Sequence, residues 1–127
     1  MHQEKKPTDS ELEILKILWE MGKCTVREVH EKLTVKKPSG YTTTLKLMQI
    51  MLEKGLVGRN KDAKSHVYFA TLLENDAQEY LLSKLVNAAF RGSRSKLVLQ
   101  ALGGAKTSKK ELDEIREYLD SIEDQNE

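Results

Sequence analysis

The chain has 127 residues, of which 39% are apolar and 32% charged, with a net charge of +1, one cysteine and three histidines. This length allows one domain and a small appendage, which favours a binding or regulatory protein over an enzyme with a cleft between two lobes. The lone Cys24 has no disulfide partner and the histidines lack metal-ligand spacing, so we expect no metal or cofactor. Neither a membrane span nor the apolar core of a signal peptide is present, so we expect a cytoplasmic protein.

Charge is unevenly distributed along the chain. Residues 21–70 carry ten Lys/Arg against four Asp/Glu, a net charge of +6, whereas residues 1–20 and 71–127 carry net charges of −2 and −3. A basic segment between acidic ones fits a polyanionic partner for that segment alone. A solvated, lysine-rich surface is the other interpretation that the charges allow.

Two helices are predicted in the N-terminal part of the chain. The first begins at the capping segment 7–11 and ends at Gly22. Thr25 caps the second, whose apolar residues recur at spacings of three and four, while its charged residues and His30 face outward. The loop 36–40 contains a proline and a glycine and separates this helix from the next one.

A third helix and a β-hairpin follow. Apolar residues recur at spacings of three and four from Leu45 to Leu52, and Gly55 ends the helix in the manner of a C-terminal glycine. Segments 56–57 and 66–70 are rich in strand formers and enclose a polar, basic turn, so we expect them to form a hairpin. Three helices followed by a hairpin predict a winged helix-turn-helix.

Three more helices are predicted after Glu74, and each carries an apolar stripe. Such a stripe is often intramolecular core, but about 50 residues make a weak core on their own, which favours association with a second copy. The stripe residues that we assign to a dimer interface are Leu81, Leu82, Leu85, Phe90, Leu97, Leu112, Ile115, Leu119 and Ile122. The predicted fold is therefore mainly α with a small β-hairpin: a winged helix-turn-helix domain at 1–72 and a helical dimerisation domain at 73–127.

The third helix carries the candidate DNA-reading residues. In a helix-turn-helix this helix lies in the major groove, and residues near its N-terminus meet base edges. Threonine can bond a phosphate or base and touch a thymine methyl, glutamine suits adenine, and lysine suits guanine or phosphate. The polar residues at the start and along the outer side of the helix are Tyr41, Thr42, Thr43, Lys46 and Gln49. The residues that we assign to phosphate and wing contacts are Thr25, Arg27, Lys36, Lys37, Arg59, Lys61 and Lys64.

Other interpretations of these residues stay open. Thr42, Thr43 and Thr44 can simply cap the third helix. A winged helix can also be a protein-interaction module without operator-specific DNA binding, although the basic hairpin and the lysines of the third helix favour double-stranded DNA. Ser39 and His66 lack the nucleophile elbow, phosphate loop or metal cluster of an enzyme, so we predict no catalysis.

Three segments carry a resemblance to a known family: TDSELEILKILWEMGKCTVREVHEKL, GYTTTLKLMQIMLEKGLVGRNKDAKSHVYFA and FRGSRSKLVLQALGGAKTSKKELDEIREYLDSI. Together they resemble the first two helices, the recognition helix with its wing, and the dimerisation region of the penicillinase-repressor (BlaI/MecI/CopY) family of bacterial transcriptional repressors. The resemblance covers nearly the whole chain. It implies a homodimer that represses transcription from a palindromic operator, with the C-terminal helices as the dimer interface and an upstream protease or sensor as a further partner.

The family's recognition-helix contact positions fall at Thr42, Thr43, Leu45 and Lys46. Leu45 replaces what is often a polar or basic residue, and Ile50 stands where an arginine is common. The resemblance therefore does not supply the operator sequence.

The resemblance also bears on how repression is relieved. In the β-lactam-responsive members an Asn-Phe bond is cleaved after the Gly-Ser motif, and the matching position here is Gln100-Ala101, so the bond itself is not preserved. The copper-responsive members end in paired cysteines that bind Cu(I). The C-terminal segment SIEDQNE has none, so we expect no copper sensing by that route.

Overall fold

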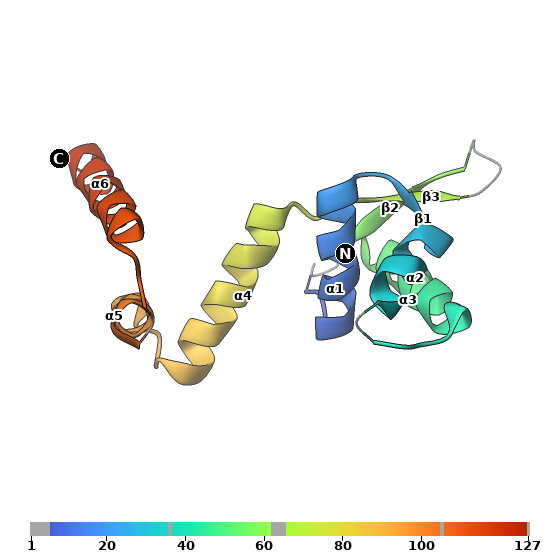
Figure 1. Cartoon of the computed structure of the whole chain (residues 1–127), viewed down its shortest axis with the longest axis horizontal. Coiled ribbons are helices and arrows are strands. Elements are labelled where there is room, and N and C mark those ends of the chain that lie inside the picture. Colours follow the sequence, from blue (N-terminus) through green and yellow to red (C-terminus); the bar gives the residue numbers. More distant parts are fainter. Residues whose placement is uncertain (1–5, 36, 62–65, 105, 127) are drawn as a thin grey trace. The chain divides into compact units, whose positions relative to one another are not determined.

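The computed structural model describes residues 6–35, 37–61, 66–104 and 106–126. In chain order the elements are α1 (Asp9–Met21), β1 (Cys24–Thr25), α2 (Val26–Thr34), α3 (Tyr41–Lys54), β2 (Val57–Asn60), β3 (Val67–Ala70), α4 (Glu74–Ala89), α5 (Arg94–Gly104) and α6 (Lys109–Gln125) (Figure 1). The predicted helices and hairpin are present, which confirms the mainly helical fold. Among the described helices, none has the length and apolar content needed to cross a membrane.

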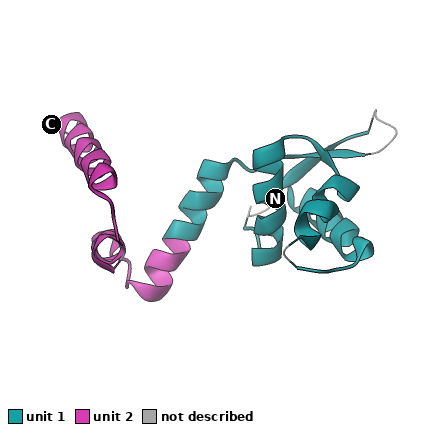
Figure 2. Ribbon diagram, viewed as in Figure 1, with its two compact units in different colours: residues 1–82 teal, residues 83–127 magenta. Residues whose placement is uncertain are grey.

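The chain divides into two compact units, unit 1 from Met1 to Leu82 and unit 2 from Ser83 to Glu127 (Figure 2). The division falls inside α4, whereas the domains predicted from the sequence meet before this helix begins. Unit 1 contains α1 to α3, the strands and the first part of α4. Unit 2 contains the end of α4 with α5 and α6.

The predicted capping of the first two helices at segment 7–11 and at Thr25 is confirmed, and in each case it takes the form of a capping box. Thr8 Oγ1 accepts a hydrogen bond from the Glu11 amide at 3.2 Å, and the Thr8 amide donates to Glu11 Oε1 at 2.8 Å. Thr25 and Glu28 repeat this arrangement at the start of α2. Each box satisfies amides that have no partner within the helix. The predicted end of α1 at Gly22 is also confirmed, and this residue has a positive φ of 83° that suits glycine.

The strands form an antiparallel sheet in the order β1-β3-β2. β2 and β3 pair along their full length and make the predicted hairpin. The sequence did not predict β1, because two residues are too few to show the alternation of a strand. β1 pairs Cys24 with Tyr68, and it thereby joins the start of α2 to the hairpin.

The core of unit 1 lies between α1, α2, α3 and the sheet. Its buried residues are Ile14, Leu15, Leu18, Cys24, Val26, Val29, Met48, Met51, Leu56, Val57, Tyr68, Leu72 and Ala77. At its edge, Trp19 Nε1 donates a hydrogen bond of 2.9 Å to the Leu72 carbonyl, which holds α1 against the segment between β3 and α4. Burial, and then the nearby Glu28 carboxylate, raise the pKa of the Cys24 thiol, so Cys24 is a neutral core side chain.

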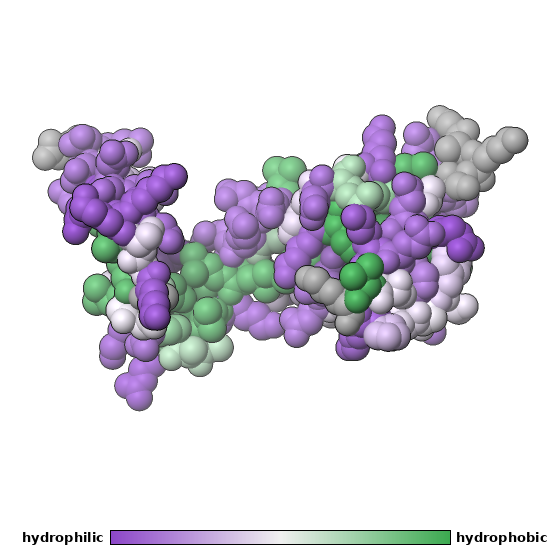
Figure 3. All heavy atoms as spheres, viewed as in Figure 1, coloured by the Kyte–Doolittle hydropathy of each residue, from purple (hydrophilic) through white to green (hydrophobic). Residues whose placement is uncertain are grey.

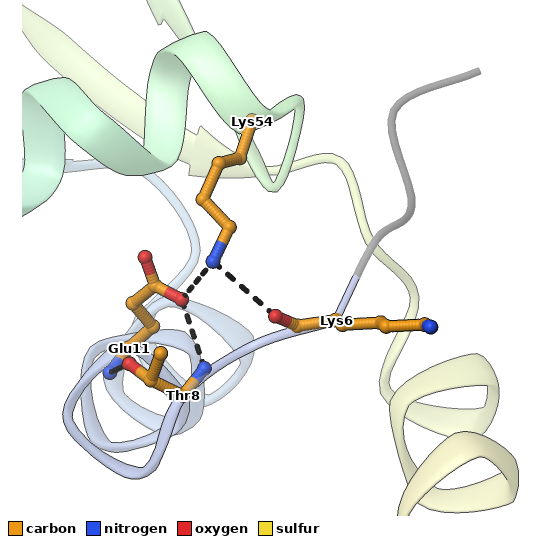
Figure 4. A network of polar contacts seen from close by, with 4 residues as sticks. All are labelled: Lys6, Thr8, Glu11 and Lys54. Carbon is orange, nitrogen blue, oxygen red and sulfur yellow. Dashed lines mark hydrogen bonds and ion pairs between the residues drawn. The ribbon is translucent and has the colours of Figure 1, made fainter.

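A partly buried ion pair joins the start of α1 to the end of α3 (Figure 4). Lys54 Nζ lies 2.6 Å from Glu11 Oε1 and donates a second hydrogen bond of 3.2 Å to the Lys6 carbonyl. The Glu11 side chain is only 2% exposed, whereas that of Lys54 is 31% exposed. Burial by itself raises the pKa of Glu11, but hydrogen bonds from Lys54 and the Thr8 amide outweigh it and hold the pKa below its ordinary value. The pair therefore anchors the C-terminal end of α3 to α1.

Unit 2 has little core within a single chain. Val86 is the one buried residue among those described in this unit, and α5 and α6 bury none. Hydrophobic side chains instead gather over the C-terminal part of α4 and over α5 on the face in view in Figure 3. The exposed large apolar residues of this unit are Leu85, Val98, Leu99, Tyr118, Leu119 and Ile122.

Candidate nucleic-acid interface

The N-terminus of α3 is not capped by its threonines. Its N-cap residue is Gly40, which provides no side-chain hydrogen bond, so the capping interpretation of Thr42, Thr43 and Thr44 is wrong. Thr44 is buried, and its Oγ1 lies 2.9 Å from His30 Nδ1 in a hydrogen bond between α3 and α2. Thr42 and Thr43 are exposed. The three threonines therefore divide into one structural residue and two that face solvent.

We call the exposed residues of α3 that follow Tyr41 the outer face of this helix. These residues are Thr42, Thr43, Lys46, Gln49, Ile50 and Glu53. They recur at helical spacing, because the opposite side of the helix packs Thr44, Met48 and Met51 into unit 1. The outer face thus presents short hydroxyls, a cation, an amide, one apolar side chain and one carboxylate along a single helix.

Tyr41 is held between two side chains of α2. The Arg27 guanidinium carbon lies 5.1 Å from the centre of the tyrosine ring, and His30 meets the ring edge-on at a centroid distance of 5.6 Å. Both distances suit favourable cation–π and aromatic contacts. His30 was expected to face outward, but the structure places it half-buried between α2 and α3, where it hydrogen-bonds Thr44 and contacts the Tyr41 ring. Arg27, Tyr41 and His30 therefore fix the start of α3 relative to α2.

A shallow basic hollow of about 400 Å³ opens between α2, α3 and the hairpin. Its lining residues are Thr25, Val26, Arg27, Tyr41, Leu45, Gln49, Arg59, His66 and Tyr68. Arg59 stands opposite the buried Tyr68 in the sheet, and its Nε is buried with no hydrogen-bond partner in the described part of the chain. A buried donor without a partner is unfavourable. The hollow itself is lined by the Arg27 and Arg59 side chains, with no carboxylate among its described lining residues. The basic hollow is therefore suited to an anionic oxygen.

Of the other predicted phosphate contacts, Thr25 lines this hollow. Thr25 Oγ1 already accepts the Glu28 amide, which leaves its hydroxyl hydrogen free to donate elsewhere. Lys37 and Lys61 are exposed, on the loop before α3 and at the end of β2. Lys36 and Lys64 lie outside the described residues.

Some residues of this site were not predicted from the sequence. The hydrogen bond between His30 and Thr44 joins residues 14 positions apart, so no local motif reveals it. Arg59 pairs with the buried Tyr68 across the hairpin, and its Nε is buried as well. The sequence of the hairpin alone does not predict this burial. His66, which was predicted as the first residue of the second strand segment, lies just before β3 and is exposed at the edge of the basic hollow.

The predicted interface residues of the C-terminal helices are accessible in the single chain. Leu85, Leu119 and Ile122 are exposed by 50%, 51% and 36%. The remaining ones are half-buried: Leu81, Leu82, Phe90, Leu97, Leu112 and Ile115. Gln100 and Ala101, the position matched to the family's cleavage site, are exposed within α5.

The chain is similar to named repressors and regulators in its sequence. The sequence profile of the family described as Penicillinase repressor matches residues 7–121. The chain is 24% identical over 113 residues to the penicillinase repressor of Bacillus licheniformis, covering 89% of this chain and 88% of that protein. It is 24% identical over 112 residues to the methicillin resistance regulatory protein MecI of Staphylococcus aureus strain N315, covering 88% and 91%.

Two solved structures are similar to this chain in their fold. The DNA-binding domain of the repressor BlaI superposes with a TM-score of 0.53 at 24% identity, covering 60% of this chain and 93% of that one. A complex of hsRosR-S4 gives a TM-score of 0.53 at 20% identity, covering 82% and 97%. At these identities the likeness shows the winged-helix fold alone. Because the profile covers nearly the whole sequence, the chain belongs to the penicillinase-repressor family, a family of transcriptional repressors rather than enzymes.

Proposed function

We propose that this protein is a homodimeric, sequence-specific repressor in which each copy inserts α3 into one half-site of an inverted-repeat operator. The observation that carries the proposal is the outer face of α3. Thr42, Thr43, Lys46 and Gln49 are exposed on one helix face, and this helix is anchored at both ends by contacts to α1 and α2. Rigid positioning of short polar groups is what reading base edges requires.

The chemistry of the outer face suits the major groove. Thr42 and Thr43 lie in the first turn, where a recognition helix meets base edges. Lys46 suits guanine or a phosphate, and Gln49 can pair its amide with adenine. Because each of these side chains is exposed, none has to leave a core contact to reach DNA.

The basic hollow supports a phosphate contact beside this helix. Arg27 and Arg59 supply two cations, and the Thr25 hydroxyl supplies a further donor. A DNA backbone phosphate in the hollow would meet the Arg27 and Arg59 side chains and help to fix the register of α3 in the groove. Lys61 would follow the adjacent backbone from the hairpin.

The C-terminal helices supply the proposed dimer interface. The predicted interface residues of α4 to α6 are half-buried or exposed in one chain, and a second copy would cover them. A two-fold symmetric dimer binds half-sites separated by whole turns of DNA, so its operator would be an inverted repeat. Repression would follow from exclusion of the polymerase, in the bacterial cytoplasm where the operator lies.

Selection of bound sites from random DNA tests the proposal. The purified full-length chain is incubated with a random duplex library, and the bound fraction is sequenced after several rounds at two salt concentrations. We expect enrichment of an inverted repeat. Binding without enrichment, at an affinity that depends only on salt, would contradict sequence-specific repression and favour a protein-interaction module.

A further inference from the structure

Ile50 is an unexplained apolar residue on the outer face of α3. Its side chain is 39% exposed, although the apolar residues on either side of it in the sequence that pack inward, Met48 and Met51, are completely buried. Isoleucine is also a poorer helix former than the straight-chain residues usual on an exposed helix surface. Neither core packing nor helix propensity therefore accounts for isoleucine at this position.

The helix places Ile50 on the same strip as two residues of the proposed recognition surface. Lys46 precedes it by four residues and Thr43 by seven, so the three side chains lie above one another on successive turns. Seven residues of α-helix advance by about 10 Å, which is close to three base-pair steps of about 3.4 Å. An α3 that lies along the groove with Thr43 against one base pair therefore brings Ile50 over another.

The chemistry of the groove limits what Ile50 can contact. Its side chain neither donates nor accepts a hydrogen bond, so phosphates and polar base edges offer it nothing. The apolar group that a base presents in the major groove is the C5 methyl of thymine. Glu53, exposed one turn further along, disfavours a phosphate near this part of the helix, which leaves base edges as the surface in reach.

We propose that Ile50 is a specificity-determining residue that reads the C5 methyl group of a pyrimidine in each half-site. The inference rests on the proposed function, because it requires α3 in the major groove. Its ligand is the methyl group rather than the base as a whole. Thymine and 5-methylcytosine therefore satisfy Ile50 equally, and uracil and cytosine do not.

Methyl deletion in the DNA tests the proposal without changing any hydrogen bond. In the operator chosen by selection, each thymine is replaced in turn by deoxyuridine, and the dissociation constant of the full-length dimer is measured at one salt concentration. We expect at least one position per half-site at which the loss weakens binding about fourfold, as for one buried methyl group, and at which this effect depends on Ile50. Cytosine at this position should bind weakly, and 5-methylcytosine should recover the same factor of about four over cytosine.

The Ile50→Ala variant tests whether the methyl preference depends on the Ile50 side chain. It should bind the thymine and deoxyuridine operators with equal affinity, while the matched variant Lys46→Ala should keep the methyl preference. A fourfold preference that persists in Ile50→Ala, or a wild-type protein that ignores every methyl, would overturn the inference and leave the proposed function standing. Loss of the dimer in Ile50→Ala, seen by light scattering, would also overturn it by showing that a second copy covers this side chain. A wild-type protein that selects no sequence at all would overturn both.

Discussion

The two units of this chain bury their apolar residues differently. Unit 1 packs side chains from three helices and the sheet into one core, and it anchors α3 at both ends. Unit 2 buries only Val86 among its described residues, and it exposes leucines along three helices. A helix with an uncovered apolar stripe gains stability when a partner covers it. The outer face of α3 is therefore formed within one chain, whereas the apolar stripes of unit 2 are left for the proposed second copy to cover.

The largest expected effect follows from a charge placed in the stripes of unit 2. Leu85→Asp or Leu119→Asp puts a carboxylate on a surface that the proposed dimer buries, and burial of an unpaired charge is strongly unfavourable. We expect each variant to be monomeric by light scattering at concentrations where the wild type is a dimer. The matched control is Glu114→Asp, an exposed position of α6 that already carries a charge and should stay dimeric. A dimer that persists in both leucine variants would place these stripes outside the interface.

The core of unit 1 gives the next largest effect. Leu15→Ala removes a completely buried side chain, and we expect a loss of about 2–5 kcal/mol in the free energy of unfolding. Leu99→Ala, at a position that is 68% exposed in a single chain, should leave the unfolding of a monomeric variant nearly unchanged. Urea denaturation in the Leu119→Asp background measures both. Equal losses of stability in Leu15→Ala and Leu99→Ala would contradict the difference in burial between the two units.

The ion pair at the end of α3 gives an intermediate effect. Lys54→Met leaves the Glu11 carboxylate buried with one partner fewer, and we expect a loss of about 1–3 kcal/mol in the free energy of unfolding, which allows for the partial exposure of Lys54. Lys16→Met breaks the exposed pair with Glu13 and should change stability by less than about 0.5 kcal/mol. Similar losses of stability in Lys54→Met and Lys16→Met would show that the burial of Glu11 does not make its ion pair more important for stability.

The same pair predicts a dependence on pH. The pKa of Glu11 is lower in the folded chain than in the unfolded one, so its contribution to stability is present above the ordinary carboxyl pKa and is lost as pH falls through the folded-state value. Lys54→Met should therefore lose less stability on acidification than the wild type does. Denaturation midpoints at neutral and acidic pH measure the difference, and parallel curves would contradict it.

Loss of a proposed base contact from α3 should have an effect of similar size, but on the free energy of operator binding rather than on stability. Lys46→Ala should weaken operator binding by about 1–3 kcal/mol and relax the preference at one base pair, because Lys46 is proposed to meet a base edge. Its fold should be unaffected, since the side chain is exposed. Repeating the site selection with the variant measures the change, and an unaltered preference would remove Lys46 from base reading.

The smallest effect concerns the basic hollow. Arg59→Gln should weaken operator and unrelated DNA alike and make the slope of log affinity against log salt shallower by about 1, as for one lost phosphate contact. Arg116→Gln makes the same change of charge in α6, where the side chain pairs with Asp113, and should leave the slope unchanged. A selective loss of operator binding in Arg59→Gln would indicate a base contact instead.

The sequence predicted the elements whose signals are local. The capping boxes of α1 and α2 each lie within four residues, and Gly22 and Gly55 end their helices as expected, because these signals depend on a single turn of backbone. β1 was missed because its pairing with β3 joins distant segments. The separate role of Thr44 was missed for the same reason, since it depends on His30 in another helix. Three adjacent threonines look equivalent in a sequence, and only packing distinguishes the buried one.

The most direct test of the account is the mass of the full-length protein, alone and on DNA, by light scattering. We predict twice the mass of one chain in solution, two chains on a duplex with the selected inverted repeat, and far weaker binding to a duplex with one half-site. The account would be contradicted by a protein of single-chain mass that binds one half-site as tightly as the full repeat, because unit 2 would then have no part in operator recognition.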